Sequence, residues 1–517
     1  MGLRETLSRG DIQWTGLVAG PVLAFVTYLS LPETYAGSAG ETLVFTHSGR
    51  ATAALAVWMA VWWMTEAIPI YATALLPLAF LPSAGASSMR EAAAPFGNEL
   101  IYLFMGGFII ALAMQRWNLH KRIAYMTLRL VGTRTHMVVA GFMGITAFLS
   151  MWVSNTATTI MMLPIALSVI DLALSHHTEQ SLADTEELGG EAGHNFALCL
   201  LLGIAYAASI GGIGTLIGTP PNLFLASFIE ENLGGEVSFV RWMGVGVPLV
   251  VVFVPAVWLL LTRVLYPIRI RRIEAEGSLT HGAFVSLGPM TRGEWAVLVV
   301  FACTAAAWVF RPLLQNVSFA GARPFAGLTD PGIAITAALV LFVIPVDIRK
   351  RVFVMDWQTA VRLPWGLLVL FGGGLSLAAA IRTNGVSEFI GSQVVSFAGF
   401  PPVILVILVV TMMIFLTELT SNTATTAALV PILAAVAPGL GIHPYLLIVP
   451  AAVAASCAFM LPVATPPNAI VFGSGFVRIA QMVRAGFWLN VLGIVLITLL
   501  TYAIAMPLLL SNGSPAP

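Results

Sequence analysis

Long apolar stretches separated by short polar segments make up most of this chain. Nine of them come close to the length that a helix needs to cross the roughly 30 Å hydrocarbon core of a bilayer: residues 14–31, 51–64, 68–81, 100–117, 244–266, 295–310, 331–344, 364–381 and 485–510. Strands of a membrane barrel would instead alternate apolar and polar residues over about ten positions. The pattern therefore predicts an all-α integral membrane protein.

Two longer apolar stretches are each interrupted by the same six residues. The sequence SNTATT begins at Ser154 within residues 136–174, and it begins again at Ser421 within residues 401–436. With a polar run at its centre, neither half of such a stretch is comfortably a full span. A re-entrant hairpin with the polar run at its tip is therefore expected in both places.

Two further apolar stretches are broken by proline. The sequence Thr-Pro-Pro-Asn begins at Thr219 within residues 196–228, and again at Thr465 within residues 443–472. Because proline forbids a continuous helix, these breaks are expected to leave backbone carbonyls available. The six-residue and four-residue sequences recur in the same order, which indicates an internal duplication. In an apolar chain, paired interruptions of this kind point to the binding site of a transporter.

Composition and charge agree with a membrane protein. The chain is 58% hydrophobic and 9% charged, with a mean hydropathy of +0.92, far from the soluble average of about 25% charged residues. Its formal net charge of zero argues against nucleic acid as a partner. Cys199, Cys303 and Cys457 are scattered through apolar segments without CxxC spacing, so neither a disulfide framework nor a metal cluster is indicated.

The distribution of basic residues predicts an orientation. Nine uninterrupted spans and two proline-broken helices make eleven crossings. With the N-terminus in the cytoplasm, only six of the 24 Lys and Arg residues lie outside: Arg50, Arg90, Arg241, Arg311, Arg323 and Arg382. An odd number of crossings between the copies makes the two-fold repeat inverted. We therefore expect 11 transmembrane helices plus two re-entrant hairpins in the cell inner membrane, with the N-terminus cytoplasmic and the C-terminus outside.

The segments that carry the repeated sequences contain no basic residue. Neither residues 135–240 nor residues 383–477 include a Lys or an Arg. An anionic substrate would therefore be held by other groups, and helix N-termini with Ser, Asn and Thr side chains offer such donors. Two tips that enter from opposite sides would meet near the midplane, where each could take one carboxylate.

A dianion held in this way needs cations to compensate its charge, because half a charge at each helix end is too little. Ser150, Ser154 and Asn155 offer hydroxyl and amide oxygens in the first hairpin, and Thr417 and Asn422 do so in the second. The glycine-rich residues 211–215 and the break at residues 464–466 add backbone carbonyls. Neutral oxygen ligands of this kind suit a monovalent cation such as Na⁺.

The two SNTATT sequences, the two Thr-Pro-Pro-Asn sequences and WWMTEAIP at residues 62–69 cover most of the chain. Together they resemble the motifs of the divalent anion/Na⁺ symporter family, which includes the INDY-like bacterial dicarboxylate transporters. The resemblance implies eleven helices with two hairpins, a homodimer, and elevator-type movement of a transport domain against a fixed scaffold.

The resemblance also implies specific sites and domains. Substrate contacts are expected from Ser154, Asn155, Thr156, Ser421, Asn422, Thr423, Thr465 and Pro466, a first Na⁺ site at Ser150, Ser154, Asn155, Gly211, Gly212, Gly214 and Thr215, and a second at Thr417, Thr420, Asn422 and Ala464. The domains expected are scaffold helices at 1–134, the first hairpin and broken helix at 135–240, connecting and scaffold helices at 241–382, the second hairpin and broken helix at 383–484, and the last helix and C-terminus at 485–517. Residues 135–240 and 383–484 would form the transport domain.

Three features receive a structural interpretation. Gly106-Gly107 and residues 372–374 are expected to allow close helix packing, and structural roles are favoured for Glu66 and Glu418. The glycines of residues 211–215 have no counterpart in the second half, where residues 457–460 read Cys-Ala-Phe-Met. The two cation sites are therefore not required to be equivalent.

The prediction for function is a secondary transporter that carries a C4-type dicarboxylate, such as succinate, malate or fumarate, together with Na⁺. The alternatives are a Na⁺-independent dicarboxylate exchanger and a carrier of citrate or sulfate. An ion channel would need a continuous polar path, and two helix-broken tips closing on one another argue against it. An intramembrane hydrolase would need a nucleophile with a base, such as Ser with His or paired Asp, within the spans. Asp171 is the only Asp placed in a hairpin, with no His at a matching depth, so no enzyme is expected.

Overall fold

The computed structural model describes residues 9–37, 41–123, 126, 132, 134–180, 186–270, 288–318, 322–395 and 399–510. These residues are mostly helical. Eight of their helices are long and apolar enough to cross a membrane, and six further apolar helices are shorter. The coarse prediction of a helical membrane protein is confirmed. The termini, residues 1–8 and 511–517, whose sides of the membrane were predicted from charge, lie outside the described residues.

The elements follow the predicted order along the chain. The first half contains α1 (Arg9–Ser30), β1 (Thr34–Ala36), β2 (Thr42–Val44), α2 (His47–Thr65), α3 (Ile70–Thr73), α4 (Leu76–Ser83), α5 (Met89–Ala93), η1 (Ala94–Gly97), α6 (Glu99–Arg116), α8 (Thr135–Ser150), α9 (Asn155–Gln180), α10 (Glu186–Gly212), α11 (Pro220–Leu233), α12 (Phe239–Leu259) and the π-helical η2 (Leu260–Leu265). The second half contains α14 (Arg292–Leu314), α15 (Asp330–Val343), β3 (Pro345–Asp347), β4 (Val352–Phe353), α16 (Trp357–Ala360), α17 (Trp365–Thr383), α18 (Val386–Val394), α19 (Pro402–Thr417), α20 (Asn422–Gly439), α21 (Tyr445–Ala455), α22 (Pro466–Phe472), α23 (Ile479–Leu500), the π-helical η4 (Thr501–Ala505) and α24 (Met506–Leu510).

One predicted span is interrupted. Residues 68–81 do not form a single helix, because α3 ends at Thr73 and α4 begins at Leu76. Pro77 explains the break, since proline has no N–H to bond to the carbonyl four residues earlier and is favoured in the first turn of a new helix. Pro77 accordingly occupies the first turn of α4.

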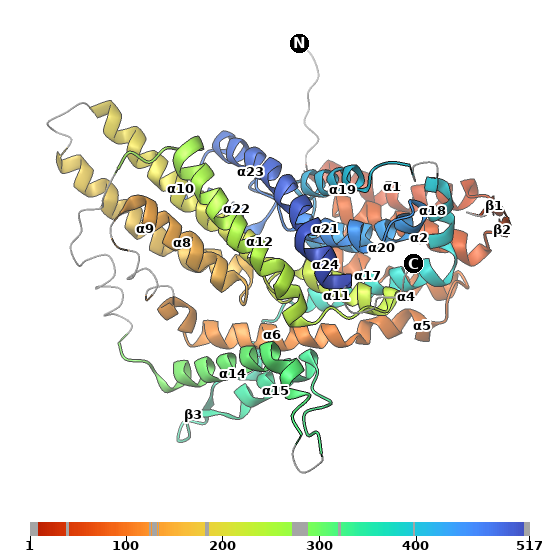
Figure 1. Ribbon diagram of the computed structural model, residues 1–517, viewed down its shortest axis with the longest axis horizontal. Helices are drawn as coiled ribbons and strands as arrows, with labels where there is room; N and C mark the ends of the chain where they lie inside the picture. Colours follow the sequence, from red (N-terminus) through yellow and green to blue (C-terminus); the bar gives the residue numbers. More distant parts are fainter. Residues whose placement is uncertain are drawn as a thin grey trace.

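The helices from the two halves of the chain interlock. In the first half α10 packs against α8 and α9, and in the second half α21 packs against α19 and α20. Across the halves, α22 contacts α9 and α10, while α11 contacts α20 and α21. Figure 1 shows α8, α9 and α10 at one end of the molecule, and α1, α2 and the β1–β2 hairpin at the other.

Glycines allow the closest approaches between helices, as predicted for Gly106-Gly107 and residues 372–374. A Cβ on Gly106 would lie 2.6 Å from the carbonyl carbon of Ala334, so α6 and α15 meet with no room for a side chain. A Cβ on Gly374 would lie 2.6 Å from the ring of Phe224 on α11. The packing role of these glycines is confirmed.

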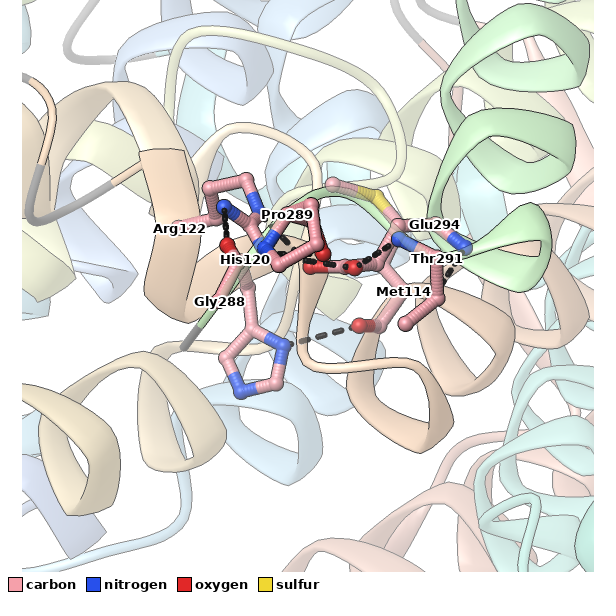
Figure 2. A network of polar contacts seen from close by, with 7 residues as sticks. All are labelled: Met114, His120, Arg122, Gly288, Pro289, Thr291 and Glu294. Carbon is pink, nitrogen blue, oxygen red and sulfur yellow. Dashed lines mark hydrogen bonds and ion pairs between the residues drawn. The ribbon is translucent and has the colours of Figure 1, made fainter. Parts of the chain in front are cut away.

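A buried ion pair joins the segment after α6 to the start of α14 (Figure 2). The Arg122 Nε donates to Glu294 Oε1 at 2.7 Å, and the side chains of both residues are no more than 5% exposed. Arg122 also donates to the carbonyl of Gly288 at 3.0 Å. Glu294 in turn accepts from the backbone N–H of Thr291 at 2.7 Å and so caps α14. One guanidinium thus links segments that lie more than 160 residues apart.

His120 lies beside this pair. Burial lowers the pKa of its imidazole, which favours the neutral ring. Its Nδ1 lies 2.8 Å from the carbonyl oxygen of Met114. Figure 2 marks this contact with a dashed line. Because a carbonyl only accepts, Nδ1 carries the proton and His120 ties its segment back to the end of α6.

Removing the arginine of this pair should destabilise the protein strongly. We expect Arg122→Ala to lower the free energy of unfolding by about 3–5 kcal/mol, because Glu294 would be left as an unpaired buried charge. Thermal unfolding in detergent measures the change. Glu33→Gln is the control, since that carboxylate is 81% exposed in its pair with Arg50, and its loss should cost less than about 1 kcal/mol. Equal effects of the two variants would contradict the assignment.

Candidate functional site

The first SNTATT sequence begins at the end of the bend between α8 and α9, with Ser154 in the bend and Asn155 as the first residue of α9. Ser150, the last residue of α8, places its Oγ 2.6 Å from Asn155 Oδ1 and 2.6 Å from the carbonyl oxygen of Ala208 on α10. Ser154 accepts from the backbone N–H of Ala157 at 3.3 Å and caps α9. Three oxygens therefore converge on this bend, and the one hydroxyl proton of Ser150 can serve only one of its two neighbours.

The second SNTATT sequence repeats this arrangement between α19 and α20. Thr417 Oγ1 lies 2.6 Å from Asn422 Oδ1 and 3.0 Å from the carbonyl oxygen of Ala455 on α21. Ser421 accepts from the backbone N–H of Ala424 at 3.5 Å. The same cluster of three oxygens and one hydroxyl proton is thus present twice. The predicted interruptions at both sequences are confirmed.

The proline-containing breaks are closed by asparagine side chains. Asn222 Nδ2 donates to the carbonyl oxygens of Gly212, Ile213 and Thr215, at 3.1, 3.2 and 2.8 Å. In the second half, Asn468 Nδ2 donates to Ala458 at 3.2 Å and to Leu461 at 3.0 Å. Each asparagine stands in the first turn of the helix after the break and reaches back to the loop before it. These side chains satisfy carbonyls that a continuous helix would have paired.

Several buried oxygens at these breaks have no hydrogen-bond partner within the described part of the chain. They are the Oδ1 atoms of Asn222 and Asn468 and the Oγ atoms of Ser209 and Ser456, all in residues that are at most 1% exposed. The same two positions are affected in both halves. Neutral hydroxyl, amide and carbonyl oxygens in this number suit a hard cation, which would complete their coordination.

The first tip and the first break touch one another. Ser150 contacts α10 through Ala208, and Thr215 donates to the carbonyl of Met151 in the bend. A Cβ on Gly212 would lie 2.6 Å from Asn155 Oδ1. The structure thereby brings together Ser150, Asn155, Gly212 and Thr215, which the sequence assigned to one site.

The remaining predicted residues differ in their contacts and burial. Thr420 contacts Thr425 through hydroxyls 2.6 Å apart. Thr465 caps α22 by accepting from the N–H of Asn468 at 3.3 Å. Ser154, Asn155, Thr156, Ser421 and Asn422 are half-buried, Thr423 is buried, Pro466 is exposed, Ala464 is half-buried, and Gly211 and Gly214 are buried. The half-buried tips leave surface that a ligand could reach.

Sequence reasoning missed four side chains at the site. Asn222 and Asn468 belong to the repeated Thr-Pro-Pro-Asn sequences, but the sequence interpretation considered only the prolines of these sequences. Ser209 and Ser456 stand in apolar sequence without a motif. Superposing the two copies of the duplication would have found them, because they occupy equivalent places, each directly after the alanine whose carbonyl faces the bend.

Glycine at position 218 should be indispensable to the first break. A Cβ there would overlap the Gly212 carbonyl, which is backbone and cannot rotate aside. We expect Gly218→Ala to lower the free energy of unfolding by about 1–3 kcal/mol. Gly144→Ala is the matched control, because Gly144 lies on α8 with nothing within 4 Å, and alanine is favoured there by up to about 1 kcal/mol. Thermal unfolding of both variants in detergent makes the comparison, and a harmless Gly218→Ala would contradict the close packing.

Solved structures support the fold at low sequence identity. The chain superposes on the YdaH transporter of Alcanivorax borkumensis with a TM-score of 0.54 at 14% identity, covering 97% of this chain and 99% of that one. It superposes on Neisseria gonorrhoeae MtrF with a TM-score of 0.56 at 12% identity, covering 98% and 97% of the two chains. At these identities the likeness concerns the fold alone.

Sequence comparison is more specific. The chain is 41% identical over 508 residues to the sodium-dependent dicarboxylate transporter SdcS of Staphylococcus saprophyticus, with 98% of this chain and 94% of the relative covered. It is 40% identical to SdcS of Staphylococcus aureus, covering 96% and 92%. The family model described as the sodium:sulfate symporter transmembrane region matches residues 42–510. The chain therefore belongs to this symporter family, as its motifs predicted.

Proposed function

We propose that this protein is a secondary active transporter that moves a C4-type dicarboxylate across the inner membrane together with Na⁺. The observation that carries the proposal is the pair of equivalent oxygen clusters, one at each SNTATT bend, in segments that contain no Lys or Arg. Relatives with 40–41% identity are named sodium-dependent dicarboxylate transporters. Binding a dianion without basic residues requires cations, and the clusters offer ligands for them.

The two tips are suited to hold the two carboxylates. Each tip is the N-terminus of a helix that is 18 residues long or longer, and a serine caps it. The first N–H groups of such a helix point away from it and carry its positive partial charge. We assign substrate contacts to Ser154, Asn155 and Thr156 at one tip and to Ser421, Asn422 and Thr423 at the other. Thr465 and Pro466 would complete the site at the second break.

Sodium would bind beside each tip as co-transported substrate. Ser150 and Asn155 supply two oxygens of the first site, with Ser154 and residues 211–215 around them. Thr417 and Asn422 supply two of the second, and we assign Thr420 and Ala464 to it as well. In each cluster the oxygens have only one hydroxyl proton among them, so they repel one another. A bound cation would offset that repulsion. The same atoms would then bind Na⁺ and stabilise the bend.

Transport would follow an elevator mechanism. The contacts of α9 with α22 and of α11 with α20 join the two hairpins and the two broken helices, residues 135–240 and 383–484, into one unit. That unit would move against a scaffold formed by residues 1–134 and 241–382, with the last helix at 485–517, in a homodimer. Eleven spans with inverted hairpins would let the unit open to either side.

A second candidate is transport of sulfate, which the description of the family model names. Sulfate carries its two charges on one centre, whereas a dicarboxylate separates them and can use both tips. Citrate and exchange without Na⁺ remain further alternatives. Competition for uptake by succinate, citrate and sulfate would separate the substrates.

Uptake into proteoliposomes tests the proposal. We expect radiolabelled succinate to accumulate when an inward Na⁺ gradient is imposed, and to accumulate little with K⁺ in its place, because the dianion needs bound cations. Uptake that is indifferent to Na⁺ but stimulated by internal succinate would instead identify an exchanger. Accumulation of sulfate but not succinate would assign the second candidate.

Variants of the two tips test the site. Asn155→Ala and Asn422→Ala should each reduce succinate uptake by at least about 100-fold, because each removes a ligand of cation and substrate together. Asn316→Ala is the matched control, since Asn316 is exposed and bonds only locally to Pro312. Size-exclusion chromatography establishes that each variant is folded. Wild-type transport by folded tip variants would refute the assignment.

A further inference from the structure

We propose that Glu418 is a positioning residue and a fixed negative charge for the second cation site, and that it makes this site bind Na⁺ more tightly than the first when substrate is absent. The inference rests on the proposed Na⁺ coupling. Glu418 directly follows Thr417, whose hydroxyl belongs to the second oxygen cluster. It is 3% exposed, and it lies in a stretch that contains no Lys or Arg from residue 383 to residue 477.

The carboxylate of Glu418 binds the loop between α21 and α22. It accepts from the backbone N–H groups of Phe459 at 2.7 Å, Met460 at 3.0 Å and Leu461 at 3.2 Å. It also accepts from Asn490 Nδ2 on α23 at 2.8 Å. Four donors thus converge on two oxygens in a buried place.

The donors around Glu418 favour its carboxylate form. A backbone N–H and an amide NH₂ only donate, whereas a protonated carboxyl would need an acceptor for its own proton. Among the described residues, no ion pair includes Glu418. Among the described residues, its carboxylate is therefore held by neutral donors alone.

In the first half of the chain, the corresponding loop is held without a charged side chain. Met151 occupies the place of Glu418, directly after the hydroxyl residue of the bend, and its backbone carbonyl accepts from Thr215. The N–H groups of Ile213 and Gly214 bond within their own loop, to the carbonyls of Ile210 at 3.1 Å and Gly211 at 2.9 Å. The glycine-rich loop of the first half thus turns on itself, while the second-half loop is held open by Glu418.

Holding the loop open also orients its carbonyls. In a trans peptide the N–H and the preceding carbonyl point in opposite directions. Because the N–H of Phe459 points to Glu418, the carbonyl of Ala458 points away, where it meets Asn468 Nδ2 at 3.2 Å. The carbonyls of Phe459 and Met460 are turned away from Glu418 for the same reason. Glu418 therefore fixes the orientation of the peptide groups between residues 458 and 461 at the second break.

The test compares Glu418→Gln with wild type and with Glu388→Gln, an exposed acid in the same half of the chain. The full-length protein in detergent, without substrate, is titrated with NaCl at constant ionic strength against choline chloride while its unfolding temperature is followed. Succinate uptake into proteoliposomes gives the Na⁺ concentration for half-maximal rate and the KM for succinate at saturating Na⁺. Glu418→Asp is included because it keeps the charge on a shorter side chain.

We expect Glu418→Gln to lose most of the Na⁺-induced rise in unfolding temperature and to need about ten-fold more Na⁺ for half-maximal uptake, because a unit charge is removed from a low-dielectric site. The KM for succinate at saturating Na⁺ should stay within about two-fold of wild type. Glu388→Gln should match wild type, and Glu418→Asp should retain at least half of the Na⁺-induced rise.

Wild-type Na⁺ dependence in Glu418→Gln would overturn the proposal. If Glu418→Gln does not fold, Glu418→Asp decides, and a folded Glu418→Asp without any Na⁺-induced rise would overturn the charge assignment. If wild type shows the Na⁺-induced rise but takes up no dicarboxylate, the proposed substrate fails while the role of Glu418 stands. The absence of any Na⁺ effect on wild type would refute both.

Discussion

The hydrogen bonds that close the broken helices are the constraint on which the rest of this structure depends. A helix interrupted inside an apolar environment leaves backbone groups that lipid cannot satisfy. Here Asn222 and Asn468 reach back across the breaks to carbonyls of the preceding loops, while Ser150 and Thr417 hold the bends against the neighbouring helices. Because donors are fewer than acceptors at each place, an excess of oxygen remains. That excess places unpaired polar oxygens at the breaks, in segments that contain no Lys or Arg.

The two halves meet this constraint differently. In the first, glycines allow the loop to fold on itself, and Gly212 lies so close to Asn155 that no side chain would fit. In the second, Cys-Ala-Phe-Met at residues 457–460 stands in place of the glycines, and the buried carboxylate of Glu418 accepts the N–H groups of the loop instead. The two halves thus share the oxygen clusters, whereas the contacts that hold the neighbouring loops differ between them. If the two proposed cation sites differ in charge in this way, they would have a physical reason to fill in order.

Much of the fold followed from the sequence, because apolar length and proline act locally. The bends at Ser154 and Ser421 and the breaks at Thr219 and Thr465 lie where polar or proline residues interrupt the apolar pattern. The division of residues 68–81 into two helices was missed, although Pro77 signals a helix start, because hydropathy outweighed it in the prediction. The bonding of Glu418 to a loop some 40 residues away depends on tertiary packing, and no local pattern reports it. The sequence favoured a structural role for Glu418 but could not identify the hydrogen-bond donors that contact it.

The central claim is that the oxygen clusters bind Na⁺ that moves with the substrate. Simultaneous measurement of ²²Na⁺ and ¹⁴C-succinate entering the same proteoliposomes tests it most directly. The account predicts that ²²Na⁺ enters in fixed proportion to succinate, and that Ser150→Ala and Thr417→Ala, which each remove one hydroxyl from a cluster, reduce both fluxes together. Succinate entry at the wild-type rate with no accompanying ²²Na⁺ would contradict it.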